Sequence, residues 1–495
     1  MVFRDFWNVI CQIRHTMHRP QHNRTQKKTG ARTFVAAILL LLLCSVYAQA
    51  QSFYVADVQL SGNKKTKDQV ILREMSLHKG DSITSERLLR ILNECKENLN
   101  NLALFNYVDL THGPDADNPD DNDRICLHVK VEERWYTWPL LNVMLEDRNI
   151  SAWLKDADLQ RVTFEFGINS YNLFGLNHNL VAGLMVGYQQ AINLHYKNIA
   201  LGSSNKHFLN AGLSLSMSRH ANIITKEDSP LPLKVKDDFL TQGLQWYVNY
   251  SYRPHVRAVH NVNFSYAHTK LADTVLALNP HYWGSNDTER LNLDLQYFFR
   301  VDERDYSPFP TKGFYLKTGA RFYFSNNWAI RYIQANANAQ YYLPLHERWF
   351  AGGKITAGTS AKNARAYTLD RALGYGENVI RGYEYHVVDG QHFASFNGSI
   401  FYKIMPKKVI VINWLSALSK FNKIHFTLYA HAFFDMGAAF HSYPDSFNRL
   451  SNQFLYSTGL GLDLVTYYDI ILNVNYSINK QGEKGFHLSL KLPFM

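Results

Sequence analysis

Long apolar runs are almost absent from this chain of 495 residues. Beyond Gln51 no stretch reaches about 18 consecutive apolar residues, so we expect no spanning helix in that part of the sequence. Cysteine is also rare, since only Cys95 and Cys126 follow residue 50, too few for a disulfide framework. Cys95 shares a helical face with leucines, whereas Cys126 alternates with apolar strand residues, so we expect two free thiols on different faces.

Catalytic and metal-binding motifs are missing as well. The sequence has no G-x-S-x-G and no C-x-x-C, and His346-Glu347 lacks the second histidine of a zinc-protease helix. In the acidic segment 115–123, Pro119 stands where a calcium loop needs a ligand, so we interpret this segment as a solvated hairpin tip. We therefore expect no enzyme, no cofactor and no metal site.

The basic charge is concentrated at the N-terminus. Of the formal net charge of +10, residues 1–50 supply most, with seven Lys or Arg against one Asp. These basic residues precede the one long apolar run, Phe34 to Tyr47, and Ala48-Gln49-Ala50 follows it as a small-x-small cleavage site. The pattern predicts a secretory signal peptide over 1–50 with a basic extension that starts at Met1 or Met17. The small remaining charge gives no argument for nucleic acid.

Residues 51–133 have the periodicity of one small α+β domain in the order β-α-α-β-β. The turn Ser61-Gly62-Asn63 ends its first strand, and Thr84 or Ser85 is the expected N-cap of its second helix. We expect strands at 53–60, 104–110 and 124–132 and helices at 66–75 and 82–98.

Residues 134–495 instead alternate between apolar and polar side chains, as β-strands with one apolar face do. The last strand is the clearest case, because Phe486, Leu488 and Leu490 alternate with polar residues. The polar faces are rich in Asn, Gln and Tyr, which suits a water-filled lumen and leaves the apolar face for lipid; a soluble sandwich is disfavoured. We predict sixteen strands, at 137–145, 161–169, 178–188, 191–199, 207–218, 240–251, 258–270, 288–301, 313–324, 328–342, 348–358, 392–405, 423–436, 453–463, 468–478 and 484–494.

The connections between these strands alternate in length. Connections after odd strands are long, as at 219–239 and 359–391, whereas those after even strands are mostly short, as at 252–257. This asymmetry is typical of outer-membrane barrels, whose outer loops are long and whose periplasmic turns are short. The exception is 406–422, which would be a long periplasmic connection. Closing such a barrel requires strands one and sixteen to pair.

The N-terminal domain resembles a POTRA domain. The resemblance lies in its element order, in Val58 to Asn63 (VQLSGN), in the Lys79-Gly80-Asp81 turn and in the strand from Leu104 to Val108. With the strands that follow, the chain resembles the BamA/TamA superfamily of outer-membrane barrels, the bacterial surface antigen family, with a single POTRA domain. The resemblance implies a mostly β fold: a 16-stranded antiparallel transmembrane β-barrel over 134–495, preceded by one α+β POTRA domain over 51–133.

One connection carries the most specific motif. Its sequence, LGYGENVIRGY over 373–383, resembles the superfamily's conserved loop with the core V/I-R-G-F/Y, which folds back into the barrel. The resemblance implies that Arg381 contacts a carboxylate on the wall, and the family's aromatic-D-x-G motif is matched at Phe434-Asp435-Met436-Gly437. The alternation of that strand independently places Asp435 on the lumen face. The expected loop residues are Gly374, Gly376, Ile380, Arg381, Gly382 and Tyr383, and the expected wall residues are Asp435 and Gly437.

Two further segments match the family. Asp302-Glu303-Arg304-Asp305 with Pro310-Thr311-Lys312-Gly313 resembles its turn between strands eight and nine, which we interpret as structural. The last strand resembles the signal by which barrel substrates are recognised, although Met495 follows the aromatic residue that usually ends it. The residues matched to this signal are Gly485, Leu488, Leu490 and Phe494.

The resemblance implies a role in inserting β-barrel proteins or in translocating a polypeptide across the bacterial outer membrane, with the POTRA domain in the periplasm. It also implies that the seam between strands one and sixteen is weak and can open sideways, as it does in the superfamily. Expected partners are unfolded outer-membrane or secreted polypeptides, outer-membrane lipid and accessory lipoproteins, and no nucleic acid. The alternative is a passive porin-like channel or small-molecule transporter. A two-partner exporter usually has two POTRA domains, and this chain has room for one.

Overall fold

The structure is a computed structural model that describes residues 52–115, 117–145, 153, 162–202, 206–325, 329–411, 423–443, 448–466 and 469–491. The predicted signal peptide and Phe494 lie outside these residues. Within the described ranges, no helix is both long and apolar enough to cross a membrane.

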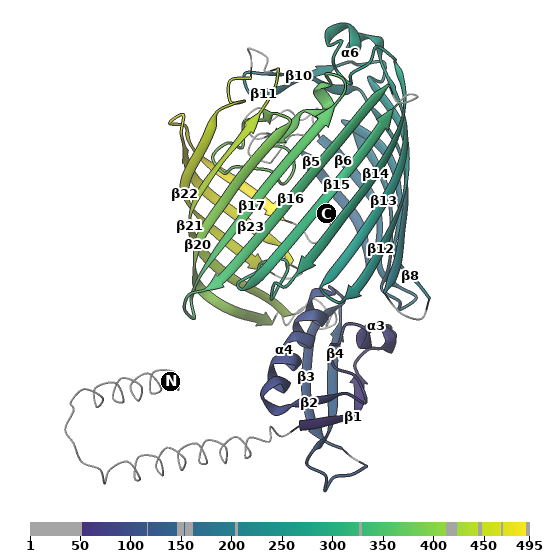
Figure 1. The fold of residues 1–495 in the computed structure, drawn as a ribbon, viewed down its shortest axis with the longest axis vertical. Coiled ribbons are helices and arrows are strands. Elements are labelled where there is room, and N and C mark those ends of the chain that lie inside the picture. The colour runs from purple at the N-terminus through teal and green to yellow at the C-terminus, as the bar shows by residue number, and fades with distance from the viewer. Residues whose placement is uncertain are drawn as a thin grey trace, which may run out of the picture.

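The N-terminal domain is a four-stranded sheet covered by two helices (Figure 1). The strand order is β2-β1-β4-β3, with β1 and β4 parallel and the other pairs antiparallel. The longer helix buries Leu88, Leu92, Cys95 and Leu99, which recur along one face and pack on the strands. Its elements are β1 (Ser52–Ser61), α3 (Asp68–Leu72), β2 (Ser82–Thr84), α4 (Ser85–Asn101), β3 (Phe105–Pro114) and β4 (Arg124–Glu133).

This domain corrects one detail of the predicted order. Ser82–Thr84 forms the short strand β2, which pairs with Ser52–Tyr54, so the helix predicted from Ser82 begins at Ser85. Thr84 takes the N-cap position, as one of the two expected residues. The order is therefore β-α-β-α-β-β, because the extended residues before the helix gain hydrogen bonds from the edge of β1. Both cysteines are free, as predicted, and both are buried.

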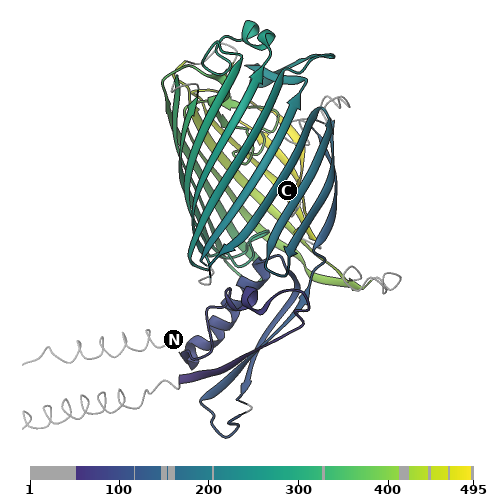
Figure 2. The same cartoon turned by 90° about the vertical axis from the view of Figure 1, so that its right-hand side faces the viewer.

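The rest of the described chain forms a barrel of sixteen antiparallel strands, each paired with its neighbour in sequence (Figures 1 and 2). Each predicted strand is present, with ends that differ by a few residues and by up to six at the long ends. The strands are β5 (Thr137–Leu145), β6 (Val162–Leu173), β7 (His178–Gly187), β8 (Gln189–Leu201), β9 (His207–Ser218), β12 (Thr241–His255), β13 (Ala258–Leu271), β14 (Glu289–Asp302), β15 (Gly313–Ser325), β16 (Ile330–Pro344), β17 (Trp349–Lys362), β20 (His392–Val411), β21 (Lys423–Phe440), β22 (Phe454–Thr466), β23 (Ile471–Asn479) and β24 (Lys484–Lys491).

The two faces of the barrel wall differ as the alternation requires. On β14, Leu291, Leu293 and Leu295 are exposed on the outer surface, where a bilayer would cover them. Asp294 between them is buried on the inner face and pairs with Arg321 of β15 at 2.6 Å. A one-residue slip in register would exchange these faces, so the alternation fixes the pairing of the strands.

The ends of the sheet correct the expectation that the first and last strands pair. Within the described residues, the sheet runs from β24 to β5 without a ladder between these two strands. Pro139 in β5 has no N–H to donate, which suits an edge strand. At the end of β24, the Lys491 ammonium donates to the Pro308 carbonyl at 3.2 Å, which holds that strand toward the turn between β14 and β15. The wall therefore has a seam between β5 and β24.

The connections show three further departures from the predicted pattern. At the barrel end far from the N-terminal domain, the structure adds the hairpin β10 (His220–Lys226) and β11 (Ser229–Lys234) and the helix α6 (Asp273–Leu278), all of which were expected as loop (Figure 1). At the near end, β20 continues to Val411, so the first part of the expected connection 406–422 is strand. The rest of that connection, 412–422, lies outside the described residues.

Candidate functional site: a loop folded into the barrel

The connection between β17 and β20 turns into the barrel instead of away from it. Its first half contains the short 3-10 helix η2 (Tyr367–Leu369) and the strand β18 (Arg371–Leu373), which pairs with β19 (Val388–Asp389) near its end. The segment between these two strands carries the Gly-rich motif and reaches the inner faces of β20 to β23. We call residues 374–387 the inward loop.

Glycine is required at two places in the inward loop. Gly374 has φ +82°, and a Cβ there would lie 2.3 Å from the His386 carbonyl oxygen, so no other residue fits. Gly382 has φ +88°, and its added Cβ would lie 3.1 Å from the Ser457 Cβ on β22. Gly376 also has a positive φ but faces open space. The first two glycines therefore let the loop double back and approach the wall closely.

Arg381 is the side chain that joins the loop to the wall. Its Nε donates to Asp435 Oδ2 at 2.8 Å and its Nη2 to Asp435 Oδ1 at 2.6 Å, which makes the pair bidentate. The Arg381 backbone N–H also donates to Oδ2, at 3.0 Å. Asp435 lies on β21, next to β20, and is fully buried. The structure thus brings together the two residues that the sequence predicts as partners.

Neighbouring groups complete the surroundings of this ion pair. The Arg381 Nη1 donates to Ser399 Oγ of β20 at 3.0 Å, and the guanidinium lies 4.0 Å from the ring centroid of Phe433. The Asn397 amide donates to Asp435 Oδ2 at 2.7 Å, so this carboxylate accepts four hydrogen bonds. These hydrogen bonds fix the position of the Asp435 carboxylate. Loss of either Asp435 or Arg381 would leave the other charge buried without its partner.

Apolar contacts seal the pair. Ile380 and Tyr383 are buried among Leu373, Phe393 and Leu455, which come from the loop and from strands β20 and β22. A Cβ at Gly437 would lie 2.8 Å from the Ile380 Cδ1, so the glycine two positions after Asp435 makes room for the loop. The motif positions that sequence reasoning selected therefore meet at one place on the wall.

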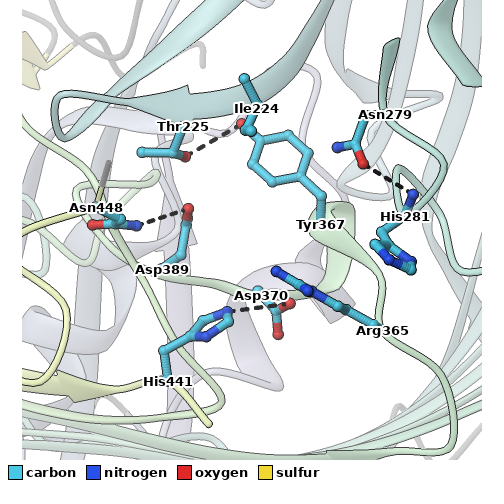
Figure 3. Close-up of a pocket in the computed structure, with 10 residues that line it drawn as sticks. All are labelled: Ile224, Thr225, Asn279, His281, Arg365, Tyr367, Asp370, Asp389, His441 and Asn448. Atoms are coloured by element: carbon cyan, nitrogen blue, oxygen red, sulfur yellow. Dashed lines mark hydrogen bonds and ion pairs between the residues drawn. The ribbon is translucent and has the colours of Figure 1, made fainter. Parts of the chain in front are cut away.

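At the far end, other loops interlock above the inward loop. Asp228, at the tip of the β10–β11 hairpin, accepts from the Leu450 N–H at 3.0 Å through its side chain and from the Val387 N–H at 2.7 Å through its carbonyl. Figure 3 shows residues of four connections around a cavity of about 240 Å³. In it, Asn448 donates to Asp389 at 3.1 Å, and Asp370 faces His441 at 3.5 Å. These contacts hold the far end in a capped form.

At the near end, the turn between β14 and β15 folds across the base of the barrel. Phe309 stacks on Tyr429 with ring centroids 4.6 Å apart and contacts Phe350 and Phe401 edge-on. The Tyr306 hydroxyl donates to Asp469, which also pairs with Arg134 at 2.9 Å. This segment carries the matched turn motif, and within it Asp305 accepts from the Thr311 hydroxyl at 2.6 Å.

Ion pairs that sequence reasoning missed fix the N-terminal domain to the barrel. Glu74, just after α3, is buried and accepts from both terminal nitrogens of Arg253 on β12, at 2.9 and 2.8 Å. Arg257 reaches Glu97 of α4 at 3.1 Å and Glu303 at 3.0 Å. Such partners lie far apart in the chain and belong to no local pattern, so no sequence signal could have paired them.

The residues matched to the C-terminal signal lie on β24 at the seam. Leu490 is exposed on the outer surface, as the alternation predicts, and Leu488 lies on the same face. Gly485 lies next to His487 on the inner face, where an added Cβ would come within 3.3 Å of its Nε2. Phe494 lies outside the described residues. Their role as a signal stays a prediction.

Comparison with known proteins matches both parts of the chain. The model of the Omp85 superfamily domain matches residues 172–490, and a POTRA model described as "Surface antigen variable number repeat" matches residues 53–134. The chain is 22% identical over 369 residues to outer membrane protein assembly factor BamA of Neisseria meningitidis serogroup B, covering 71% of this chain and 42% of that protein. The protein of the same name from Nitratidesulfovibrio vulgaris is 35% identical over 89 residues, 18% of this chain and 10% of its own.

The chain therefore spans less than half the length of these curated relatives. Among solved structures, CdiB from Escherichia coli matches with a TM-score of 0.52 at 10% identity, covering 88% of this chain and 75% of that one. That likeness shows a shared fold.

Proposed function

The chain belongs to the Omp85 superfamily, and on that premise we propose that it helps to insert β-barrel proteins into the outer membrane or to translocate a polypeptide across it. It is an outer-membrane protein whose POTRA domain lies in the periplasm. The far end of the barrel described above is then extracellular, and the near end is periplasmic. We propose a non-enzymatic role, in which the protein binds and guides a client chain through backbone hydrogen bonds and shape.

The observation that carries the proposal is the seam. Within the described residues, β24 pairs with β23 on one edge, and its other edge shares no ladder with β5. An edge strand presents a row of backbone donors and acceptors that a second chain can pair with. A client strand that added to β24 or β5 would gain these hydrogen bonds while its apolar side chains faced lipid.

The POTRA sheet offers a second edge for the same kind of pairing. Its order, β2-β1-β4-β3, leaves β3 at one border and the three-residue β2 at the other. Tyr107 on β3 is exposed beside the border. We propose that an unfolded client in the periplasm first adds a strand here and is then passed to the seam. Accessory lipoproteins and outer-membrane lipid remain proposed partners.

The inward loop supports this function by holding the wall next to the seam. Arg381 fixes the loop to β20 and β21, and the loop then packs on β22 and β23. We propose that the ion pair keeps strands β20 to β24 in their observed arrangement while a client strand pairs with the edge of β24 and leaves it. The C-terminal residues Gly485, Leu488, Leu490 and Phe494 remain a proposed recognition signal for the protein's own insertion.

A passive channel is the less favoured function. The inward loop fills part of the lumen, the extracellular loops are tied together through Asp228, and the β14–β15 turn crosses the periplasmic base. A porin needs a continuous water-filled path, and these three features obstruct it. A steady large conductance in planar bilayers would favour the channel instead.

The test is Arg381→Glu, which places a carboxylate against Asp435. We expect the folded band on unheated gels to be lost at lower temperature and the levels of other outer-membrane barrels to fall. Arg449→Glu is the control, because the Arg449 side chain is 74% exposed and lies 3.9 Å from its partner Asp228. If Arg381→Glu behaves like Arg449→Glu in both assays, the loop has no part in the function.

A further inference from the structure

The inward loop does not end at its anchor but continues to the last hairpin of the barrel, β23–β24. We propose that Glu384 and His487 are positioning residues that fasten this hairpin to the inward loop and so set the place of the seam strand β24. The proposal rests on the proposed function for its biological meaning, but its geometry and its test do not depend on client insertion.

Neutral hydrogen bonds first bring the loop and the hairpin together. The Asn479 amide at the end of β23 donates to the Gly382 carbonyl at 2.9 Å. The Tyr383 hydroxyl donates to Gln481 Oε1, in the hairpin turn, at 2.7 Å. Ser457 on the adjacent β22 donates to the Arg381 carbonyl. Ser457 is the cross-strand partner of Asp435, and Asn479 is the cross-strand partner of Ser457, so these contacts extend from the anchor on β21 across β22 to β23.

Glu384 and His487 form the buried part of this bridge. Glu384 Oε2 accepts from the Gly382 N–H at 2.7 Å and lies 3.3 Å from His487 Nδ1, a close polar contact without hydrogen-bond geometry. Both side chains are largely buried, and His487 points inward from β24. The ring of Tyr385 packs beside His487 with centroids 5.4 Å apart. His487 is the inner-face side chain through which the loop reaches the seam strand itself.

A second His–carboxylate contact lies at the rim. His386 Nε2 and Glu483 Oε2 are 2.9 Å apart, and Glu483 also accepts from the Asn479 amide at 2.7 Å. The Glu483 side chain is half exposed, so this contact contributes little on its own. The inward loop and the hairpin therefore contact each other at two successive places, through an exposed His386–Glu483 contact and a buried Glu384–His487 contact.

The bridge matters because β24 lies at one end of the sheet formed by the described strands. Its ladder with β23 spans Lys484 to Lys491, and among the described residues it shares no ladder with β5. A terminal strand held by one ladder frays readily, since each of its hydrogen bonds can open to water. The loop supplies from the lumen the support that β5 does not supply along the wall. Strands β20 to β24 are thereby tied together across the lumen as well as around it.

Burial and the charged groups around Glu384 set the protonation state of its carboxyl. The groups that face it are His487 from β24, Arg381 and Asp435 at the anchor, and Tyr385 on the loop. Burial raises the pKa of Glu384 to about 7, so the docked loop holds this carboxyl protonated in mildly acidic solution. A carboxyl whose pKa is raised by docking stabilises the docked state at low pH. That stabilisation is lost as pH rises through about 7.

The experiment is hydrogen exchange of the full-length protein in detergent or nanodiscs, with β24 amides compared with β20 amides between pH 6 and pH 8. Rates are divided by those of an unstructured peptide, which removes the intrinsic pH dependence. In the wild type, we expect the protection of β24 relative to β20 to fall at least threefold across this range. Glu384→Gln cannot ionise, so its ratio should stay flat with pH. In Glu384→Ala, the protection of the β24 amides at pH 6 should be about tenfold lower than in the wild type.

Controls keep a structural defect from imitating the result. Each variant must show the wild-type temperature of folded-band loss for the barrel as a whole, and His268→Gln alters a His–carboxylate contact on the outer wall, where no effect on β24 is expected. Equal β24 protection in wild type and Glu384→Ala would overturn the proposal, as would a pH dependence that persists in Glu384→Gln. If Glu384→Ala loses β24 protection as expected but cells that carry it keep wild-type levels of other outer-membrane barrels, the bridge is supported and the proposed function is contradicted.

Discussion

Two of the buried arginine–carboxylate pairs in this protein differ in what they join. Arg381 and Asp435 connect a loop to the barrel wall inside the lumen, whereas Arg253 and Glu74 connect the POTRA domain to the periplasmic rim. Both are bidentate, with contacts from 2.6 to 2.9 Å. Burial does not distinguish the two pairs, because both carboxylates are buried and each arginine side chain is 22% exposed. The same chemistry therefore joins a loop to the barrel wall in one case and one domain to another in the other.

This difference predicts the consequences of breaking each pair. Loss of Asp435 leaves the Arg381 guanidinium without its carboxylate inside the barrel, so the penalty falls on the barrel itself. Loss of the Glu74 charge breaks a contact between two domains, so the penalty falls on the placement of the POTRA domain.

The largest effect is expected from Asp435→Ala. It leaves the Arg381 guanidinium buried without a carboxylate and should cost about 3–5 kcal/mol of barrel stability. The measurement is the temperature at which the folded band disappears on gels, compared with wild type. An unchanged temperature would mean that the pair is not buried in the membrane-embedded protein.

Glu74→Gln should have the next largest effect, but on a different property. It leaves Arg73 and Arg253 close together without the carboxylate between them, at a cost to domain docking of about 1.5–3 kcal/mol. Limited trypsin digestion near Arg134 should accelerate at least tenfold, while the temperature of folded-band loss stays at the wild-type value. A fall in that temperature comparable with Asp435→Ala would erase the distinction between the two sites.

Arg381→Lys should have a smaller effect than either. Lysine keeps the charge but cannot donate two parallel hydrogen bonds to Asp435 while also reaching Ser399, so we expect a loss of about 1.5 kcal/mol. The folded band should then disappear at a temperature between those of wild type and Asp435→Ala. A result equal to Asp435→Ala would show that geometry, and not charge, carries the whole contribution.

The smallest effect is expected from Asp57→Ala on the POTRA surface. Its contact with Lys79 is exposed on both sides, at 48% and 70%, and exposed pairs contribute about 0–1 kcal/mol. Urea unfolding of the wild type and the variant should overlap within error, at low and at high salt. A shift larger than that of Arg381→Lys would contradict the role assigned to burial.

The strands could be predicted from the sequence because their signal is local. Each strand has one face toward lipid and one toward the lumen, so its residues alternate between apolar and polar. Leu291, Leu293 and Leu295 therefore reveal a strand without knowledge of its neighbours. The short strand β2 was missed because Ser82–Thr84 directly precedes a helix and shows no alternation. The β10–β11 hairpin and α6 were missed because their apolar residues bury against one another and not against lipid.

The site could be predicted only where a motif marked it. Arg381 and Asp435 were paired through their resemblance to the family's loop and wall motifs, aided by the alternation that turns Asp435 inward. The contacts of Glu384 with His487 and of Glu74 with Arg253 join residues more than a hundred positions apart, and neither carries a pattern. The weak seam was implied by the resemblance to the family and not by the strand pattern, because alternation reveals that a strand exists but not whether its edge has a partner.

The central claim is that the edge between β24 and β5 is where a client chain pairs. The direct test places a photo-crosslinking residue at Phe486 on β24, at Leu141 on β5 and, as the control, at Leu293 on β14, all three on the outer surface. The account predicts adducts with newly made outer-membrane or secreted polypeptides at Phe486 and Leu141 and none at Leu293. Equal labelling at all three positions, or none at the two seam positions while such clients are being made, would contradict it.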